Sequence, residues 1–478
     1  MNMLSLALRN LLRNRRRSLM TLLSMALGLA AVLLFGGYIK HMIYGLQTDF
    51  VKRGGHLQIQ HKGYFLHGSG NPAAYGILGY DAVIAGLRAD PVLAPMLSVV
   101  TPTLQFGGIA GNFEAGVSRT VYVSGLVVED QNRLRDWNPY GLTILQQLLT
   151  LSGTSSDAAV VGTGVARVLG LCEALAVPDC VYTPPPDHAA ASASGAAALP
   201  SDIAALGSGP DAAAGVTAGQ DSASAGHPPA PRIEILAANA RGAPNVAAVK
   251  VVRAEFQGVK ELDDVFVGLH LEQAQKLVFG AAAPRVTAIA VQLNETAQLP
   301  AARQRVEQLL SEQFKSSPLE VLDYEELNLY YGQTLQMFGT IFGFISVLMG
   351  AVVLFTVSNT MSMTVVERTV EIGTLRSLGL KRGGVRSMFL VEGIVLGVAG
   401  SVVGVVVAVL AAWAINSLGM TWIAPGWVDP VPLAIRVAGE PMMILGCVIG
   451  LVVVASLSAI LPAARASRLN IVDALRHV

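Results

Sequence analysis

Two long runs without charged side chains constrain this chain more than any other feature. Residues 327–366 and 393–428 contain no Asp, Glu, Lys or Arg. Each run is longer than the ~20 residues that an α-helix needs to cross a hydrocarbon core about 30 Å thick. The charged segment between them, residues 366–392, is therefore predicted to be a tight loop that joins two membrane helices.

The charges of this segment predict the side of the membrane on which it lies. Its basic residues outnumber its acidic residues. The acidic residues are Glu367, Glu371 and Glu392, and the basic residues are Arg368, Arg376, Lys381, Arg382 and Arg386. Short cytoplasmic loops carry an excess of Lys and Arg, so the segment is predicted to be cytoplasmic.

The apolar residues of the same segment predict a short amphipathic helix along the membrane face. They recur close to a helical period, at Val370, Ile372, Leu375 and Leu378. Gly379 and the pair Gly383–Gly384 are expected to end this helix and turn the chain back. Such a helix could insert its apolar face into a groove on a partner. The alternative is a positive loop that only fixes the topology.

Composition places the chain among membrane proteins. Hydrophobic residues make up 52% of the 478 residues and charged residues 14%, well below the ~25% usual for soluble domains. Mean hydropathy is +0.52. With 33 basic and 33 acidic side chains the net charge is zero, which argues against a nucleic-acid partner.

The distribution of apolar and charged residues predicts four spans and one large extramembrane domain. The first segment combines leucines on one helical face with arginines on the other, which is typical of an interfacial helix. The predicted division is 1–17 cytoplasmic interfacial helix, 18–44 first span, 45–326 external α+β domain, 327–366 stalk and second span, 367–387 cytoplasmic loop, 388–415 third span, 416–440 short external loop, 441–464 fourth span and 465–478 cytoplasmic tail.

The large domain alternates strand-like and helix-like patterns, which predicts an α+β fold. Strands are expected at 56–60, 97–106, 119–128, 246–256, 265–269, 286–293 and 319–322, and helices at 81–89, within 160–171, and at 271–278 and 298–314. Residues 183–231 are dense in Ala, Ser, Gly and Pro and are predicted to be a disordered insert.

Small residues in the third span predict close helix packing. Gly393, Gly397, Gly400 and Gly404 recur at spacings of three and four, which lets helices approach closely, although general tolerance of glycine in membrane helices is an alternative.

The cysteines and histidines give no sign of a metal site. Cys172 and Cys180 could form a disulfide if their region is external, or remain as two thiols. The spacing of His41, His56, His61 and His67 fits no standard metal site.

Several stretches resemble one known family. Glu-Arg-Thr-Val-Glu-Ile-Gly-Thr-Leu-Arg-Ser-Leu-Gly at 367–379, followed by Phe-Leu-Val-Glu-Gly at 389–393, resembles the coupling segment of FtsX-like permeases. These are the membrane subunits of the ABC transporter group that includes MacB and the lipoprotein-releasing Lol permeases. The arginine-rich start at 7–17, the ending at 462–476, and residues 248–278, which look like the periplasmic core domain of these permeases, extend the resemblance.

The resemblance implies a function and a set of partners. A separate ABC ATPase, which carries the ATP and Mg, would dock on Glu367, Arg368, Glu371, Ile372, Gly373, Leu375, Arg376, Leu378 and Gly379. Other implied partners are a second permease copy or paralogue, membrane lipid, and a periplasmic adaptor or acceptor protein. Motion would pass to the periplasmic domain to release or export a lipoprotein or amphiphile at a bacterial inner membrane. An FtsX-like regulator of a cell-wall hydrolase and an antimicrobial-peptide efflux or sensing permease are alternatives.

The sequence also predicts that this chain is not itself an enzyme. A phosphate-binding loop needs Gly, four residues and then Gly-Lys-Ser or Gly-Lys-Thr, because backbone amides and a lysine must cradle the phosphates. No lysine of the chain has that context. We therefore expect no catalytic residues and no bound cofactor or metal.

Overall fold

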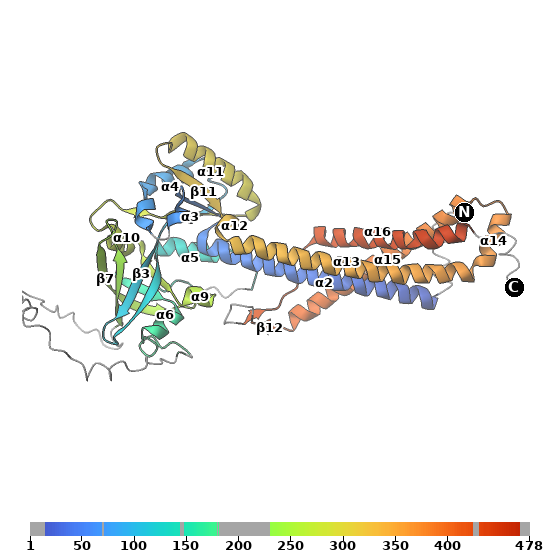
Figure 1. Cartoon of the computed structure of the whole chain (residues 1–478), viewed down its shortest axis with the longest axis horizontal. Helices are drawn as coiled ribbons and strands as arrows, with labels where there is room; N and C mark the ends of the chain where they lie inside the picture. Colours follow the sequence, from blue (N-terminus) through green and yellow to red (C-terminus); the bar gives the residue numbers. More distant parts are fainter. Residues whose placement is uncertain are drawn as a thin grey trace, which may run out of the picture.

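The computed structural model describes residues 15–68, 71–143, 148–178, 180, 230–423 and 430–468. The predicted insert therefore lies outside the described residues apart from positions 230 and 231, and so do most of the first and last predicted segments. Figure 1 shows a long bundle of helices with an α+β domain at one end.

Four described helices are long and apolar enough to cross a membrane. They are α2 (Arg15–Gly54), α13 (Leu329–Glu367), α15 (Arg382–Ser417) and α16 (Pro441–Ser467). The four helices pack as a bundle. α15 contacts α2 and α16, and α13 also lies against α2 and α16.

Two of these helices are much longer than a bilayer requires. At 1.5 Å per residue, α13 with 39 residues and α2 with 40 each extend about 58–60 Å, twice the hydrocarbon thickness. The first span is predicted to end at residue 44, and α2 continues beyond it to Gly54, with Val51 buried against Tyr324 and Tyr331 at the base of the domain. Both helices thus run from the bundle into the α+β domain (Figure 1).

The α+β domain lies between α2 and α13 in the chain, and a nine-stranded sheet forms its framework. The strand order is β11-β1-β10-β3-β4-β8-β5-β7-β6. Its strands are β1 (Leu57–His61), β3 (Leu97–Asn112), β4 (Val117–Leu126), β5 (Ala158–Val161), β6 (Arg232–Ala238), β7 (Pro244–Ala254), β8 (Phe266–His270), β10 (Ala288–Leu293) and β11 (Leu319–Asp323). The smaller strands β2 (Ile77–Leu78) and β9 (Arg285–Val286) pair with each other.

One long strand turns part of this sheet into a closed barrel. Residues 97–103 of β3 pair with β10, whereas residues 109–111 pair with β6. The six strands from β3 to β6 in the sheet order therefore form a ring, which leaves no open edge on that side.

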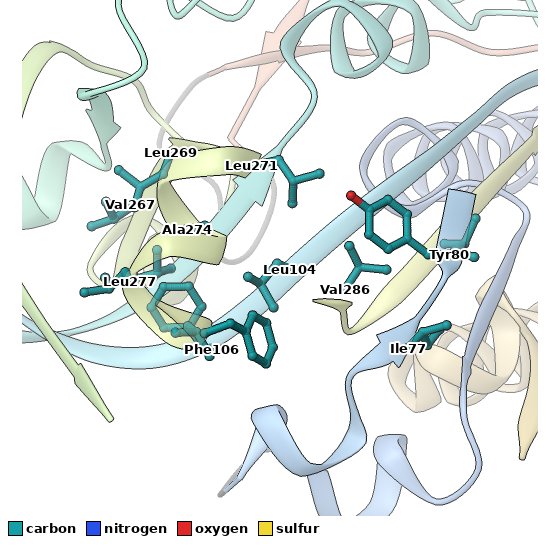
Figure 2. Packing of buried hydrophobic residues seen from close by; sticks show 14 of the residues in the cluster. Ile77, Tyr80, Leu104, Phe106, Val267, Leu269, Leu271, Ala274, Leu277 and Val286 are labelled. Carbon is teal, nitrogen blue, oxygen red and sulfur yellow. The ribbon is translucent and has the colours of Figure 1, made fainter. Parts of the chain in front are cut away.

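Helices cover this framework. They are α3 (Tyr64–His67), α4 (Tyr80–Ala89), α5 (Val128–Asp136), α6 (Thr163–Val168), α9 (Lys260–Asp263), α10 (Leu271–Phe279), α11 (Leu299–Gln313) and α12 (Tyr324–Leu327). Figure 2 shows α10 against β3 and β8, with Leu277 near Phe106 and Ala274 beside Leu269. A Cβ at Gly125 of β4 would lie 2.4 Å from the Ala274 Cβ, so this glycine lets α10 approach the barrel.

The two cysteines of the domain are joined. Cys172 and Cys180 form a disulfide that closes the turn after α6, with their Cα atoms 5.5 Å apart. Cys447, in α16, is a free thiol.

Candidate functional site

The predicted docking segment folds as a short helix, α14 (Thr369–Ser377), at the end of the bundle far from the α+β domain (Figure 1).

The sequence explains where α14 stops. Gly379 has φ +99°, which favours glycine. The Leu380 amide donates to the Leu375 carbonyl and the Gly379 amide to the Arg376 carbonyl, the two bonds of a Schellman motif. We expected Gly383 and Gly384 to contribute to this turn, but both lie in the first turn of α15, so Gly379 alone supplies the turn.

The apolar residues of α14 and its C-cap residue, Leu378, face two directions. Ile372 is 1% exposed and belongs to the hydrophobic cluster of the bundle, and Gly373 beside it is buried. Leu375 is 40% exposed and Leu378 is 80% exposed. We expected Ile372 to share the partner-facing surface with these leucines. The structure corrects this, because Ile372 anchors α14 to its own chain.

The charged residues surround the point where α13 meets α14. Glu367 ends α13, Arg368 stands between the two helices, and Arg376 lies in the last turn of α14. Arg368 Nε donates to Glu371 Oε2 at 3.0 Å. Arg368 Nη1 also lies 3.7 Å from Oε2 of Glu392 on α15, an ion pair that was not predicted from the sequence. The sequence feature that could have indicated this ion pair is Glu392 itself, a single acidic residue directly before the uncharged run 393–428.

The four predicted packing glycines occupy two helix contacts of α15. A Cβ at Gly393 or Gly397 would lie 3.0–3.1 Å from the Cβ of Ala459 or Ala455 on α16. A Cβ at Gly400 or Gly404 would lie 3.0 Å from atoms of α2. The stripe thus brings α15 into tight contact with both neighbours.

A second polar cluster, which was not predicted from the sequence, joins the bundle to the α+β domain. We call it the junction; its members are Tyr44, Gln47, His56, Tyr140, Thr296, Tyr324 and Arg436. Arg436, in the loop before α16, donates to the Tyr140 carbonyl and lies 5.4 Å from the centre of the Tyr44 ring, which stacks on Tyr140 at 4.2 Å. The Gln47 amide of α2 donates to the Tyr324 hydroxyl at 2.9 Å.

His56 is a buried member of the junction, and both of its ring nitrogens lie within hydrogen-bond distance of neighbouring groups. Its Nδ1 accepts the Leu293 amide N–H at 3.0 Å, so the proton is on Nε2, which lies 3.2 Å from Thr296 Oγ1. Burial lowers the pKa of His56 to about 4, which keeps the ring neutral. Within the described residues no group of three or more His, Cys, Asp or Glu side chains could hold a metal ion.

These observations define a membrane protein with four long helices, an α+β domain at one end and a short helix with exposed leucines at the other. Residues 343–471 match the family model of the FtsX-like permease C-terminal domain. This chain therefore carries an FtsX-like permease domain.

Three named relatives are similar to parts of this chain. The ABC transporter permease YtrF of Bacillus subtilis (strain 168) is 33% identical over 144 residues, 29% of this chain and 32% of YtrF. The lipoprotein-releasing system transmembrane protein LolC of Neisseria meningitidis serogroup B is 27% identical over 244 residues, 49% of this chain and 56% of LolC. The macrolide export ATP-binding/permease protein MacB of Escherichia coli (strain K12) is 32% identical over 144 residues, 30% of this chain and 20% of MacB. The chain thus spans about half or less of these relatives.

A solved structure of the periplasmic region of MacB from Actinobacillus actinomycetemcomitans aligns with 60% of this chain and 95% of its own, at 12% identity and a TM-score of 0.31. A score this low does not define a shared fold.

Proposed function

We propose that this chain is the membrane subunit of an ABC transporter of the MacB and Lol type. A separate ATPase, which binds the ATP and Mg, docks on α14. Its movement passes along the bundle to the α+β domain, which lies on the periplasmic side of a bacterial inner membrane.

One observation carries this proposal: α13 is a single unbroken helix from the docking segment to the domain. Only Arg368 separates it from α14, and only Asn328 separates it from α12. A rigid element of about 58 Å can carry a displacement between the two ends, since packed helices shift as units. The junction then attaches α2 and the external loop to the same domain.

The exposed leucines support docking on α14. Leu378 and Leu375 protrude from a helix that Ile372 holds to the bundle, so the apolar surface is presented on a fixed base. Buried apolar anchors carry most of the affinity of an interface, whereas charges around them mainly set orientation and association rate. Glu367, Glu371 and Arg376 would supply the charges.

The proposed cargo is a lipoprotein or another amphiphile, engaged in the periplasm or the outer leaflet. The names of LolC and MacB include lipoprotein release and macrolide export, which supports this class. A second permease copy or paralogue and a periplasmic adaptor or acceptor would complete the assembly.

Co-purification tests the docking proposal. The full chain is co-expressed with a candidate ABC ATPase subunit whose activity the wild-type chain stimulates, and Leu375→Asp is compared with wild type. An unpaired carboxylate in a desolvated groove is expected to weaken binding at least about 30-fold, the loss of one hot-spot residue. Leu418→Asp is the matched control, since Leu418 is exposed at the opposite end of the bundle. Full ATPase binding and stimulation by Leu375→Asp would show that α14 is only a topological loop.

A further inference from the structure

Glu392 is a buried carboxylate on α15, close to the docking helix. Its side chain is 6% exposed, and the Arg368 side chain that faces it is 12% exposed. Neither Glu392 Oε2 nor Arg368 Nη1 has a hydrogen-bond partner within the described residues, so the two atoms rely on each other across 3.7 Å.

Such a pair fixes geometry more than it adds stability. Removing either charge from water is costly, and the attraction between the two largely offsets that cost only while they stay together. A buried carboxylate therefore resists any movement that separates it from its arginine. Exposed ion pairs, which water screens, impose no comparable restraint.

Arg368 lies at the point where the ion pair can restrain the docking helix most directly. It is the one residue between α13 and α14, with φ −105° and ψ 15°, and its guanidinium contacts Glu371 on α14 and Glu392 on α15. One cation thus joins three helices at the corner from which the docking helix departs. Ile372, in the same helix, adds an apolar contact to the bundle.

We propose that Glu392 is a positioning residue of ATP coupling, an inference that rests on the proposed function of α14. By holding Arg368, Glu392 fixes the angle of α14 against α15. A displacement of α14 by the ATPase then moves α15 as well as α13, and the contacts of Gly400 and Gly404 pass it to α2. Without the pair, the ATPase still docks, but α14 rotates about Arg368 and its movement does not reach α15.

Three variants test the pair: Glu392→Gln, which keeps the shape and removes the charge, Arg368→Gln, and the double variant. Each full chain is purified with the ABC ATPase and placed in lipid nanodiscs. For Glu392→Gln we expect normal co-purification, a KM for ATP within about 2-fold of wild type and a stimulated kcat reduced at least about 5-fold, and for Arg368→Gln the same reduction in kcat. The double variant should lose no more than either single variant, because both act on one interaction. Glu114→Gln, on an exposed turn of the domain, is the control.

Spin labels on the full chain alone measure positioning without the ATPase. Cysteines replace Ser377 on α14 and Leu461 on α16, both exposed, with Cys447 changed to alanine. We expect one narrow distance distribution for the wild-type pair and a broader one in Glu392→Gln.

The outcomes separate the two proposals. An unchanged distribution, an unchanged kcat, or losses that simply add in the double variant would overturn the role of Glu392. Failure of the wild-type chain to bind or stimulate the ATPase would instead overturn the proposed function, and the label distances would still decide whether Glu392 positions α14.

Discussion

Buried polar side chains at the two ends of the bundle differ in charge. Arg368 and Glu392 are charged and paired at the docking end, whereas His56 is buried and neutral at the junction. The fold tolerates each because its polar atoms have suitable partners: a countercharge in one case, and the Leu293 amide and Thr296 hydroxyl in the other. Protonation of Nδ1 of His56 would remove the acceptor that Leu293 uses.

The first prediction follows from the pKa of His56. Burial lowers it to about 4 from the ordinary value of 6.5, so the unfolded chain takes up a proton at a pH where the folded chain does not. The stabilisation is complete above pH 6.5 and is lost as the pH falls toward 4, at up to about 1.4 kcal/mol per pH unit. Thermal unfolding at pH 7.5 and pH 5 should show a smaller loss for His56→Asn, which keeps an acceptor, than for wild type. Equal pH dependence of the two proteins would contradict it.

At the scale of helices, glycine determines where neighbours can meet. Gly404 of α15 lies so close to α2 that a Cβ would stand 3.0 Å from the Ala26 carbonyl oxygen and the Leu29 side chain. Gly446 of α16 is also helical, but a Cβ there would meet no atom within 4 Å. The same residue type is thus needed for packing in one helix and is replaceable in the other.

This contrast gives a second prediction. Gly404→Ala should lower the free energy of unfolding by about 1–3 kcal/mol, because backbone cannot move aside as a flexible side chain can. Gly446→Ala, the matched control, should be neutral or stabilising by up to about 1 kcal/mol from helix propensity. Thermal stability of the full chain in nanodiscs measures both. Equal melting temperatures for the two variants would mean that α15 and α2 pack less closely than described.

Elements set by local pattern could be predicted, and those set by long-range pairing could not. The apolar runs predict long membrane helices, and the structure has four helices of that kind. The expected helices at 81–89 and 271–278 are confirmed as α4 and α10. The barrel was not foreseen, because its closure pairs Ile109 with Leu236 across a long stretch of chain. The burial of Ile372 was also missed, since the helical period alone does not say which neighbour covers a face.

Across the whole molecule, the long helices and the junction connect two remote ends. α2 and α13 enter the α+β domain (Figure 1). Arg436 adds a third attachment through the loop between α15 and α16. The excess of arginine around α14 predicts that this end is cytoplasmic and that the domain is outside.

A third prediction tests this orientation. In a chain with Cys447 replaced by alanine and the native disulfide intact, an impermeant thiol reagent on intact spheroplasts should label Ala115→Cys and not Ser377→Cys. Both positions are exposed, so permeabilised cells should label both and serve as the control. Labelling of Ser377→Cys alone in intact spheroplasts would reverse the topology.

The most direct measurement of the central claim is the ATP-driven movement of the α+β domain relative to the bundle. Spin labels at Glu312→Cys on α11 and at Leu418→Cys, directly after α15, report this distance in the complex with the ATPase. We predict a shift of the distribution by about one helical turn or less, roughly 1–5 Å, between the ATP-free and vanadate-trapped states. A pair within the domain, Ala115→Cys and Glu312→Cys, should not change. Identical distributions in both states, in a complex that hydrolyses ATP, would contradict transmission from α14 to the domain.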